Sequence, residues 1–195
     1  MEQLIAFLST IYPLSGGCKD HLRKILKQRH LRKGEYILRP SQTDRYMSYV
    51  EKGLLRAYYI KKNGKEVTAW FMTSGDVITD VSSFYDQVPS SKYIQVLDDT
   101  DLYYITFSEL EFIYDNFIEF NRVGRVLITN YYKLWDKIHA GTLMQSALER
   151  YEWLLEHDPN LILRVHAKYI ASFLGITEVT LSKLKHKIAT HKSVA

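Results

Sequence analysis

The sequence contains one cysteine, Cys18, among its 195 residues. A single cysteine excludes a disulfide framework within the chain, and it cannot supply the several thiolate ligands of an iron–sulfur cluster or a cysteine-bound zinc ion. We interpret Cys18 as a small buried residue rather than a reactive thiol.

Long apolar runs are also missing. Residues 1–17 are partly apolar, but they have no basic lead-in and no run approaching about 18 apolar residues. They therefore predict neither a signal peptide nor a membrane span. We expect a cytoplasmic protein without a membrane partner.

Histidines are scarce where a catalytic β-domain would need them. Only His21 and His30 precede residue 139, which is too few for the metal-holding histidine cluster of a jelly-roll enzyme. Surface or capping roles suit both better than ligation of a haem iron. We predict no metal site, no cofactor and no enzymatic activity.

Positive charge is concentrated at the end of the chain. Residues 161–195 contain six basic side chains and one acidic one, a net charge of 6 − 1 = +5, whereas residues 1–160 contain 20 basic and 21 acidic side chains. This segregation predicts a module that binds a polyanion.

Periodicity divides the chain into a helical start, a β-rich middle and a helical end. Residues 2–31 predict two short helices interrupted at Pro13 and at the Gly16-Gly17 pair. Residues 33–106 are short runs of β-branched and aromatic residues, as in an antiparallel sandwich or jelly roll. Turn signals separate most of these runs, at Lys33-Gly34, Gly53, Asn63-Gly64, Ser74-Gly75 and Asp98-Asp99. The Asn63-Gly64 pair predicts a hairpin with a type I′ turn.

After Ser108 the apolar spacing becomes helical and follows alternating steps of three and four residues. The seam comprises Leu110, Ile113, Phe117, Phe120, Gly124, Leu127, Tyr131, Leu134 and Ile138. It predicts either a helix that pairs with a second copy, with Gly124 allowing close approach, or a helix packed on its own β-domain. A further amphipathic helix is expected over residues 141–156, ending before Pro159.

Residues 167–186, AKYIASFLGITEVTLSKLKH, have the pattern of a helix-turn-helix. Ala171 is the small residue where the two helices would cross, Gly175 suits a left-handed turn and Thr177 suits an N-cap. The buried set would be Ile170, Leu174, Ile176, Leu181 and Leu184. An ordinary helical hairpin is the alternative.

The second of these helices predicts a DNA-reading surface. Val179, Ser182, Lys183 and His186 would face a major groove, with Lys185, Lys187 and Arg164 available for phosphates. The full candidate set is Thr177, Glu178, Val179, Thr180, Ser182, Lys183, Lys185, His186, Arg164 and Lys168.

In this order of parts the chain resembles the Crp/Fnr family of transcription regulators. The resemblance rests on LRKGEYIL, on YMSYVEKGLLRAYYIKKNGKE, on residues 75–106 and above all on RVHAKYIASFLGITEVTLSKLKHKI. It implies an α+β fold: a cyclic-nucleotide-binding-like antiparallel β-roll with short flanking helices over residues 1–107, a dimerisation helix over 108–140 and a winged helix-turn-helix over 141–195. The dimer contacts would come from Phe117, Phe120, Gly124, Leu127, Tyr131, Leu134 and Ile138.

The resemblance weakens at the family's phosphate cassette, in which G-E-L/I is followed by an arginine. Aligned without gaps, the glycine falls on Thr79, the glutamate on Asp80 and the arginine on Ser90. Ser90 cannot provide the bidentate cation that holds a cyclic phosphate. We therefore expect weak or absent cyclic AMP binding, with a different effector or none. The candidate ligand residues are Thr79, Asp80, Val81, Ser82, Ser90, Ser91 and Lys92.

These features predict a homodimeric regulator that binds double-stranded DNA and has an effector-sensing β-roll. The reading helix departs from many family members, because Val179 cannot accept a hydrogen bond and Lys183 lacks the planar fork of arginine. A ligand- or protein-binding sensor that has lost DNA specificity is the alternative, and a metal-dependent jelly-roll enzyme is a third hypothesis.

Overall fold

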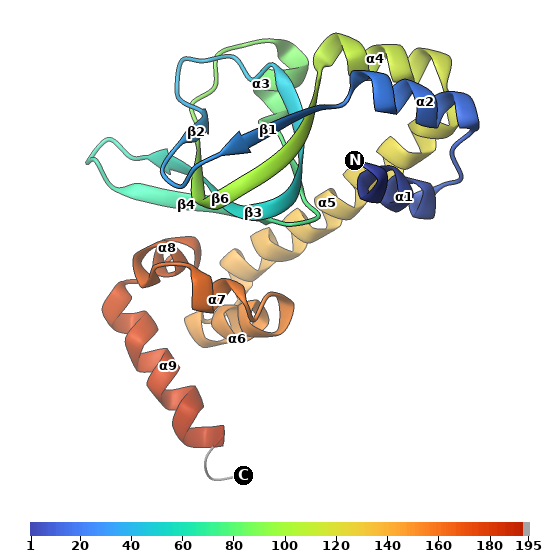
Figure 1. The fold of residues 1–195 in the computed structure, drawn as a ribbon. Coiled ribbons are helices and arrows are strands. Elements are labelled where there is room, and N and C mark those ends of the chain that lie inside the picture. The colour runs from blue at the N-terminus through green and yellow to red at the C-terminus, as the bar shows by residue number, and fades with distance from the viewer. Residues whose placement is uncertain (193–195) are drawn as a thin grey trace. The chain divides into compact units, whose positions relative to one another are not determined.

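The structure is a computed structural model that describes residues 1–192. In chain order (Figure 1) the elements are α1 (Glu2–Ile11), α2 (Gly16–Ile25), β1 (Lys27–Leu31), β2 (Tyr36–Leu38), β3 (Tyr46–Ile60), β4 (Glu66–Thr73), β5 (Val77–Ile78), α3 (Val81–Asp86), β6 (Tyr93–Thr106), α4 (Phe107–Asn116), α5 (Ile118–Met144), α6 (Ala147–His157), α7 (Leu161–Arg164), α8 (Ala167–Phe173) and α9 (Glu178–Lys192).

Packing divides the chain into two compact units, and each is discontinuous. The first combines Met1–Ala57 with Phe71–Tyr132, and the second combines Tyr58–Trp70 with the chain from Lys133 onward. These units differ from the predicted boundaries at 107 and 140, because the tip of the β3–β4 hairpin belongs with the later helices and α5 contributes to both units. None of the helices within residues 1–192 combines the length and apolar character needed to cross a bilayer.

The sheet has the strand order β1-β6-β3-β4, with β2 also paired to β6 and β5 to β3. The β1–β6, β2–β6 and β3–β5 pairs are antiparallel. Two predicted turns are absent, because β3 runs through Gly53 and β6 runs through Asp98-Asp99. Gly53 has φ +143°, and a Cβ on it would stand 2.2 Å from the Thr100 hydroxyl oxygen. Glycine therefore allows the chain to pass close to Thr100 without ending the strand.

The Asn63-Gly64 hairpin joins β3 to β4 as predicted, but its turn is not type I′. Gly64 has φ +79°, whereas Asn63 is not among the residues with positive φ. The Gly64 amide donates to the Lys61 carbonyl at 2.8 Å, and the Lys61 amide donates to the Lys65 carbonyl at 2.9 Å. This is the three-residue type of loop in which a single glycine takes the left-handed position.

The apolar core of the first unit lies where α1, α2, α4 and the start of α5 pack on β6. Its buried members are Leu4, Ile5, Leu8, Leu14, Cys18, Leu22, Phe84, Tyr103, Ile105, Leu110, Ile113, Phe120 and Val123. Burial raises the pKa of the Cys18 thiol to about 11, so this side chain packs as a small apolar group. Residues 27–31 form β1 rather than the end of a helix, because they pair with β6 over Leu31↔Thr100 to Lys27↔Tyr104.

The predicted seam from Leu110 to Ile138 is divided between two helices. α4 begins with a capping box between Thr106 and Glu109 and ends at Asn116, and the next residue, Phe117, has an extended backbone. α5 then begins at Ile118 and continues to Met144. A single dimer helix starting near Leu110 is therefore not present.

The first helix that lies wholly within the second unit, α6, has a local signal at each end. α6 has a capping box between Ser146 and Glu149 and ends at His157, as the following Asp158-Pro159 pair predicts. Within residues 1–192 no strand follows β6, so the predicted wing is not seen in the part of the chain that the structure describes.

Candidate nucleic-acid and ligand sites

The turn between α8 and α9 has the geometry predicted for a helix-turn-helix. Gly175 has φ +69°, and the next amide, that of Ile176, donates to the Ala171 carbonyl at 2.9 Å. The Thr180 amide donates to the Thr177 hydroxyl at 3.1 Å, so Thr177 caps α9. The left-handed glycine redirects the chain, and the threonine then starts the second helix.

The side chains predicted to hold these helices together are inside. Ile170, Ala171, Leu174 and Leu181 are buried, and Ile176 and Leu184 are half-buried. Two further contacts tie α8 to its surroundings in the same unit. The Ser172 hydroxyl accepts from the Thr68 amide at 3.0 Å and donates to the Glu66 carbonyl at 3.1 Å, both on β4.

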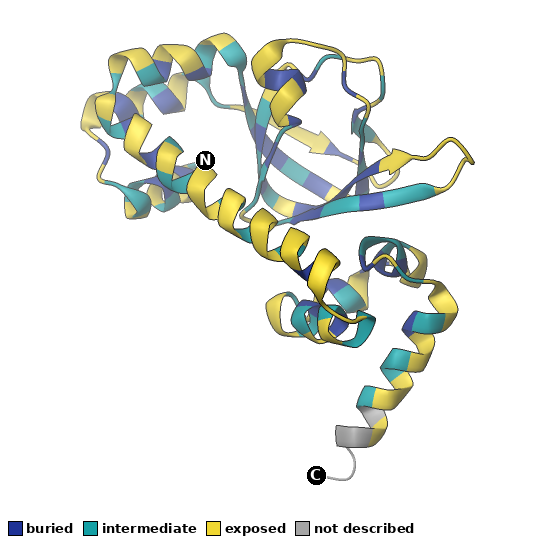
Figure 2. Ribbon diagram, turned by 180° about the vertical axis from the view of Figure 1, so that it is seen from behind, coloured by how far each residue is buried: buried dark blue, intermediate teal, exposed yellow. Residues whose placement is uncertain are grey.

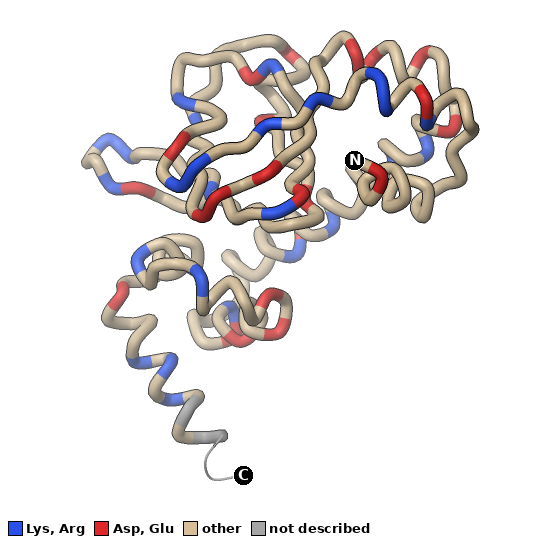
Figure 3. The backbone as a smooth tube through the Cα atoms, in the orientation of Figure 1, with Lys and Arg blue, Asp and Glu red and all other residues tan. Residues whose placement is uncertain are grey.

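The opposite side of α9 is exposed and basic. Val179 is 66% exposed, and Ser182, Lys183, His186 and Lys187 are also exposed. Basic positions recur along the helix (Figure 3), and Glu178 is its one acidic residue. This face can donate hydrogen bonds and neutralise phosphates, as a DNA-reading helix must.

The other predicted DNA contacts occupy more varied positions. Arg164 at the end of α7 and Lys168 on α8 are exposed, with the Lys168 ammonium 4.8 Å from the centre of the Tyr169 ring. Thr177 and Glu178 are exposed at the start of α9, whereas Thr180 and Lys185 are half-buried. The structure thus brings Val179, Ser182, Lys183 and His186 onto one open face and leaves Thr180 and Lys185 beside it.

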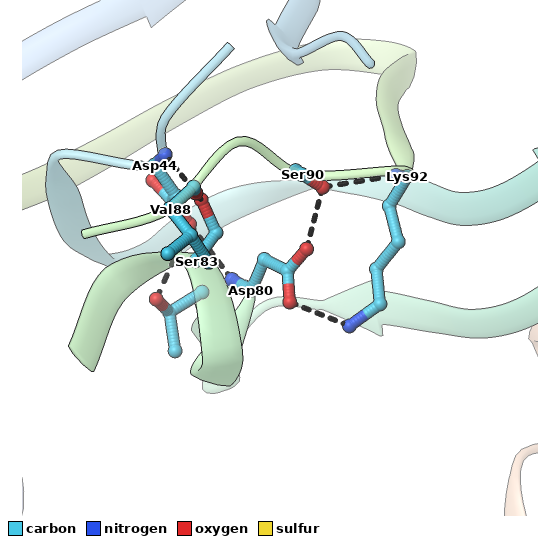
Figure 4. A network of polar contacts seen from close by, with 7 residues as sticks. Asp44, Asp80, Ser83, Val88, Ser90 and Lys92 are labelled. Carbon is cyan, nitrogen blue, oxygen red and sulfur yellow. Dashed lines mark hydrogen bonds and ion pairs between the residues drawn. The ribbon is translucent and has the colours of Figure 1, made fainter. Parts of the chain in front are cut away.

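The cassette-like region holds a buried polar network centred on Asp80 (Figure 4). The Asp80 carboxylate accepts from the Ser90 hydroxyl at 2.5 Å and from the Lys92 ammonium at 2.8 Å. The Lys92 amide also donates to the Ser90 hydroxyl at 2.9 Å. Of the seven predicted ligand residues, these three converge, whereas Val81, Ser82 and Ser91 are exposed and outside the network.

A second carboxylate, Asp44, supports this network from the loop before β3. It accepts from the Asp80 amide at 2.7 Å and from the Thr79 hydroxyl at 3.2 Å. The Asp44 amide in turn donates to the Ser83 hydroxyl, which donates to the Val88 carbonyl. No spacing in the sequence pointed to Asp44, because Thr79, Asp80 and Ser83, its partners in this network, lie more than 30 positions away along the chain.

The pKa values of the two buried carboxylates are shifted in opposite directions. Burial raises the pKa of Asp44 despite the backbone amides of Asp80 and Tyr46 that donate to it. Burial also acts to raise the pKa of Asp80, but the Lys92 ammonium and the Ser90 hydroxyl outweigh it, so the pKa of Asp80 lies below its ordinary value. Asp80 therefore remains a carboxylate. It occupies the Lys92 ammonium and the Ser90 hydroxyl, which are the donors that an incoming anion would need.

The predicted dimer seam on α5 is used within the chain. Phe120 is buried in the core of the first unit, against which Phe117 and Leu127 also pack. A Cβ on Gly124 would meet the Tyr114 hydroxyl at 2.5 Å, so this glycine accommodates Tyr114 rather than a partner helix. Gly124 therefore does not have its predicted environment.

The distal part of the seam also faces inward. The Tyr131 hydroxyl accepts from the Val77 amide at 2.7 Å and donates to Asp76 at 3.2 Å, and burial raises the pKa of this phenol. Leu134 and Ile138 are half-buried. This face therefore agrees with the alternative prediction, in which the seam packs on its own chain and not on a second copy.

A different face of α5 is open, and sequence analysis missed it. It lies about a third of a turn from the predicted seam, and Figure 2 shows exposed positions recurring along the helix. We define the exposed stripe as Ile118, Asn121, Arg125, Ile128, Tyr132, Trp135 and His139, all exposed. Its steps of three and four residues were available in the sequence, but the inner seam had more apolar members and masked it.

Comparison with known proteins agrees with this architecture. Residues 28–117 match the family model of the cyclic nucleotide-binding domain. None of the curated proteins matches the sequence.

Several solved structures share the fold at low sequence identity. FixK2 from Bradyrhizobium japonicum is 24% identical with a TM-score of 0.71 and 86% coverage of each chain. CooA from Carboxydothermus hydrogenoformans is 21% identical with a TM-score of 0.68, over 91% of this chain and 80% of that one. A transcriptional regulator of the Crp/Fnr family from Eubacterium rectale is 18% identical with a TM-score of 0.70, over 93% and 88%. Residues 28–117 are therefore similar to a cyclic nucleotide-binding domain, and the chain has a mixed helix and antiparallel-sheet fold similar to that of solved Crp/Fnr regulators.

Proposed function

We propose that this protein is a DNA-binding transcription regulator of the Crp/Fnr type that acts as a homodimer in the cytoplasm. The observation that carries the proposal is the open face of α9, where Val179, Ser182, Lys183 and His186 are exposed beyond a left-handed glycine turn. The similarity in fold to solved regulators supports it.

The open face of α9 suits the major groove. Lys183 can donate to the acceptor edge of guanine, and Ser182 can donate to or accept from either base of a pair. Lys187 and the exposed Arg164 and Lys168 then supply phosphate contacts. Val179 offers an apolar contact to a thymine methyl group in place of a hydrogen bond.

The exposed stripe of α5 provides the dimer contact in this proposal. Ile128, Tyr132 and Trp135 are 57%, 65% and 49% exposed, which is unusual for large apolar side chains spaced at three and four residues. Pairing two α5 helices through the stripe would bury them. A two-fold dimer would place its two α9 helices in successive major grooves, about 34 Å apart, and prefer a roughly palindromic site.

We infer further that the β-domain does not bind cyclic AMP in the usual way. Lys92 and Ser90 already hold the Asp80 carboxylate, and Ser90 stands where the family's arginine would be. Calorimetric titration with cyclic AMP up to about 1 mM should give no saturable heat. A dissociation constant of about 1 mM corresponds to a binding free energy of about −4.1 kcal/mol. Saturation in the micromolar range would contradict this inference. A different effector is left open.

A salt titration with genomic DNA fragments tests the central proposal. We expect binding whose affinity falls steeply as salt rises from about 50 to 200 mM, because Lys and Arg side chains displace counterions from phosphates. Absence of binding at the lowest salt would overturn the proposal. Binding without preference for any selected fragment would support instead the sensor that has lost DNA specificity.

Lys183→Ala separates base reading from phosphate contact. If Lys183 reads a base, its loss should cost about 1–3 kcal/mol of binding free energy at one position of the selected site. If it contacts a phosphate, its loss should weaken binding to all sequences alike. Lys62→Ala is the matched control, because Lys62 is an exposed lysine in the hairpin loop. An equal loss in both variants would assign the effect of Lys183 to net charge alone.

A further inference from the structure

A pocket of about 490 Å³ lies at the N-terminal part of α5, wholly within the first unit. It is lined by Tyr12, Ile118, Glu119, Asn121, Arg122 and Arg125. Its volume is within the range of about 300–1,000 Å³ that small-molecule sites occupy. It is separate from the cassette-like region, whose polar groups are engaged with one another.

The charged groups in this pocket leave an excess of positive charge. Two arginines and one glutamate line it, so its formal charge is 2 − 1 = +1. Glu119 is already engaged, because the Ser15 hydroxyl donates to it at 2.6 Å and the Ser15 amide at 3.3 Å. Within residues 1–192, neither Arg122 nor Arg125 forms an ion pair with a carboxylate. Both guanidinium groups are therefore available to an external anion.

The remaining lining is apolar and aromatic. The Arg122 guanidinium lies 4.8 Å from the centre of the Tyr12 ring, which orients its donors beside that ring. Ile118 is 83% exposed at the first position of α5. A ligand that covers Tyr12 and Ile118 and carries a negative charge would match both kinds of lining.

We propose that this pocket binds a small organic anion. Its charged group accepts hydrogen bonds from Arg122 and Arg125, which are one helical turn apart, and its apolar body packs on Tyr12 and Ile118. An aryl phosphate or an aromatic carboxylate has this chemistry. Inorganic phosphate would satisfy the arginines but leave the apolar lining uncovered.

The position of the pocket links binding to self-association, a step that depends on the proposed homodimer. Ile118, Asn121 and Arg125 belong both to the pocket and to the exposed stripe of α5. In a two-fold pair whose α5 helices run parallel through the stripe, each Arg125 lies near its copy, and like charges repel. A bound anion neutralises that repulsion, so it favours the dimer over the monomer.

Binding is tested first, with phenyl phosphate as the probe and the full chain as the protein. We expect saturable binding by calorimetry and a shift of the Ile118 methyl signals in NMR spectra. Inorganic phosphate should bind more weakly, and benzyl alcohol, which has no charge, should not bind. Arg122→Gln with Arg125→Gln removes both arginine contacts and should weaken the binding of phenyl phosphate by at least about tenfold, since the loss of even one charge-assisted contact is expected to cost about that much.

The matched control is Arg45→Gln with Lys62→Gln, which removes the same charge at two exposed positions outside the pocket. It should bind phenyl phosphate as the unaltered protein does. An equal loss in the control, or unchanged Ile118 signals at saturation, would overturn the site. Circular dichroism of each variant ensures that the comparison is between folded proteins.

Sedimentation equilibrium then tests the coupling. Phenyl phosphate should lower the dimer dissociation constant of the unaltered protein severalfold. Arg125→Gln should dimerise more tightly without the probe and no longer respond to it. Binding by a protein that stays monomeric would leave the site standing and overturn the homodimer, whereas a dimer indifferent to phenyl phosphate would overturn the coupling and leave the regulator proposal intact.

Discussion

The Lys92 ammonium lies 2.8 Å from one oxygen of Asp80, and the Ser90 hydroxyl lies 2.5 Å from the other. Both carboxylate oxygens are thus engaged by side chains from the segment just before β6, while the Asp80 amide donates to Asp44. The network ties the loop before β3, the start of α3 and the approach to β6 together. Its contribution to stability can be measured apart from any ligand.

Asp80→Asn should destabilise the fold. The amide cannot accept a hydrogen bond from Lys92 and Ser90 with the strength of a carboxylate, and it leaves a partly buried ammonium without its countercharge. We expect the free energy of unfolding to fall by about 2 kcal/mol in urea denaturation. A double-mutant cycle with Lys92→Met should give a coupling energy of about 1 kcal/mol or more.

The Glu2–Arg23 ion pair is the matched control for this cycle. Its side chains are 68% and 41% exposed, so its coupling energy should be clearly smaller than that of the buried network, because solvent screens the two charges. If the two cycles gave equal energies, the buried network would add nothing beyond an ordinary surface pair.

The effect of Asp80→Asn should depend on pH. The pKa of Asp80 is lower in the folded protein than the value of about 3.9 in an unfolded chain, so its stabilising contribution is present above pH of about 4 and is lost as the pH falls through the folded value. The pKa of Asp44 is raised, and its own contribution therefore changes in the opposite direction. Asp44 is present in both the unaltered protein and Asp80→Asn, so its contribution cancels when the two are compared. The difference between their free energies of unfolding should shrink below pH of about 4. A constant difference down to pH of about 2 would contradict the assignment.

Gly124→Ala tests the inward face of α5. The new Cβ would press on the Tyr114 ring, whose nearest atoms stand at 2.5–3.0 Å, and overpacking of this kind costs about 1–3 kcal/mol. Higher helix propensity offsets up to about 1 kcal/mol of that. Tyr114→Phe should recover part of the loss, because it removes the closest atom. If the loss appeared only as weaker dimerisation and Tyr114→Phe made no difference, Gly124 would face a partner helix after all.

Gly175→Ala tests the turn between α8 and α9. Nothing lies within 4 Å of the added Cβ, so the cost comes from the left-handed backbone alone and should be about 1 kcal/mol. Gly175→Asn is the control, because asparagine tolerates this conformation better. DNA affinity and thermal unfolding should both fall in the order Gly, Asn, Ala. Equal values for the two variants would mean that the turn conformation is not limiting.

Ile128→Glu tests the exposed stripe as a dimer contact. A charge at the centre of a paired helix should shift sedimentation equilibrium toward monomer by about tenfold or more, since burying an unpaired carboxylate is costly. Asn130→Glu places the same charge on an exposed position of another face of α5 and should leave association unchanged. Equal effects of the two substitutions would remove the stripe from the proposal.

The turn between α8 and α9 was predictable because its constraints are local. The left-handed Gly175, the capping Thr177 and the buried Leu181 lie within seven residues, so propensity and spacing determine them together. The hairpin at Asn63-Gly64 was predictable for the same reason, although the loop length and not the dipeptide set the turn type.

Features that depend on distant contacts were not predictable. Asp98-Asp99 looked like a turn, yet pairing with β1, β2 and β3 carries β6 through it. The seam on α5 was recognised as apolar, but periodicity does not say whether a partner or Tyr114 covers it. The Asp80–Lys92 pair likewise depends on the loop that brings residues 80 and 92 together.

Arg150 on α6 donates to the Gln145 carbonyl at 2.5 Å and to the Leu174 carbonyl at 3.0 and 3.1 Å. One guanidinium thus hydrogen-bonds both to Gln145, the first residue after α5, and to Leu174, the first residue after α8. The Gln145 carbonyl, just past α5, and the Leu174 carbonyl, just before Gly175, accept from the same planar guanidinium. A rotation of the backbone at Gln145 must therefore either move Leu174 with it or break a charged hydrogen bond.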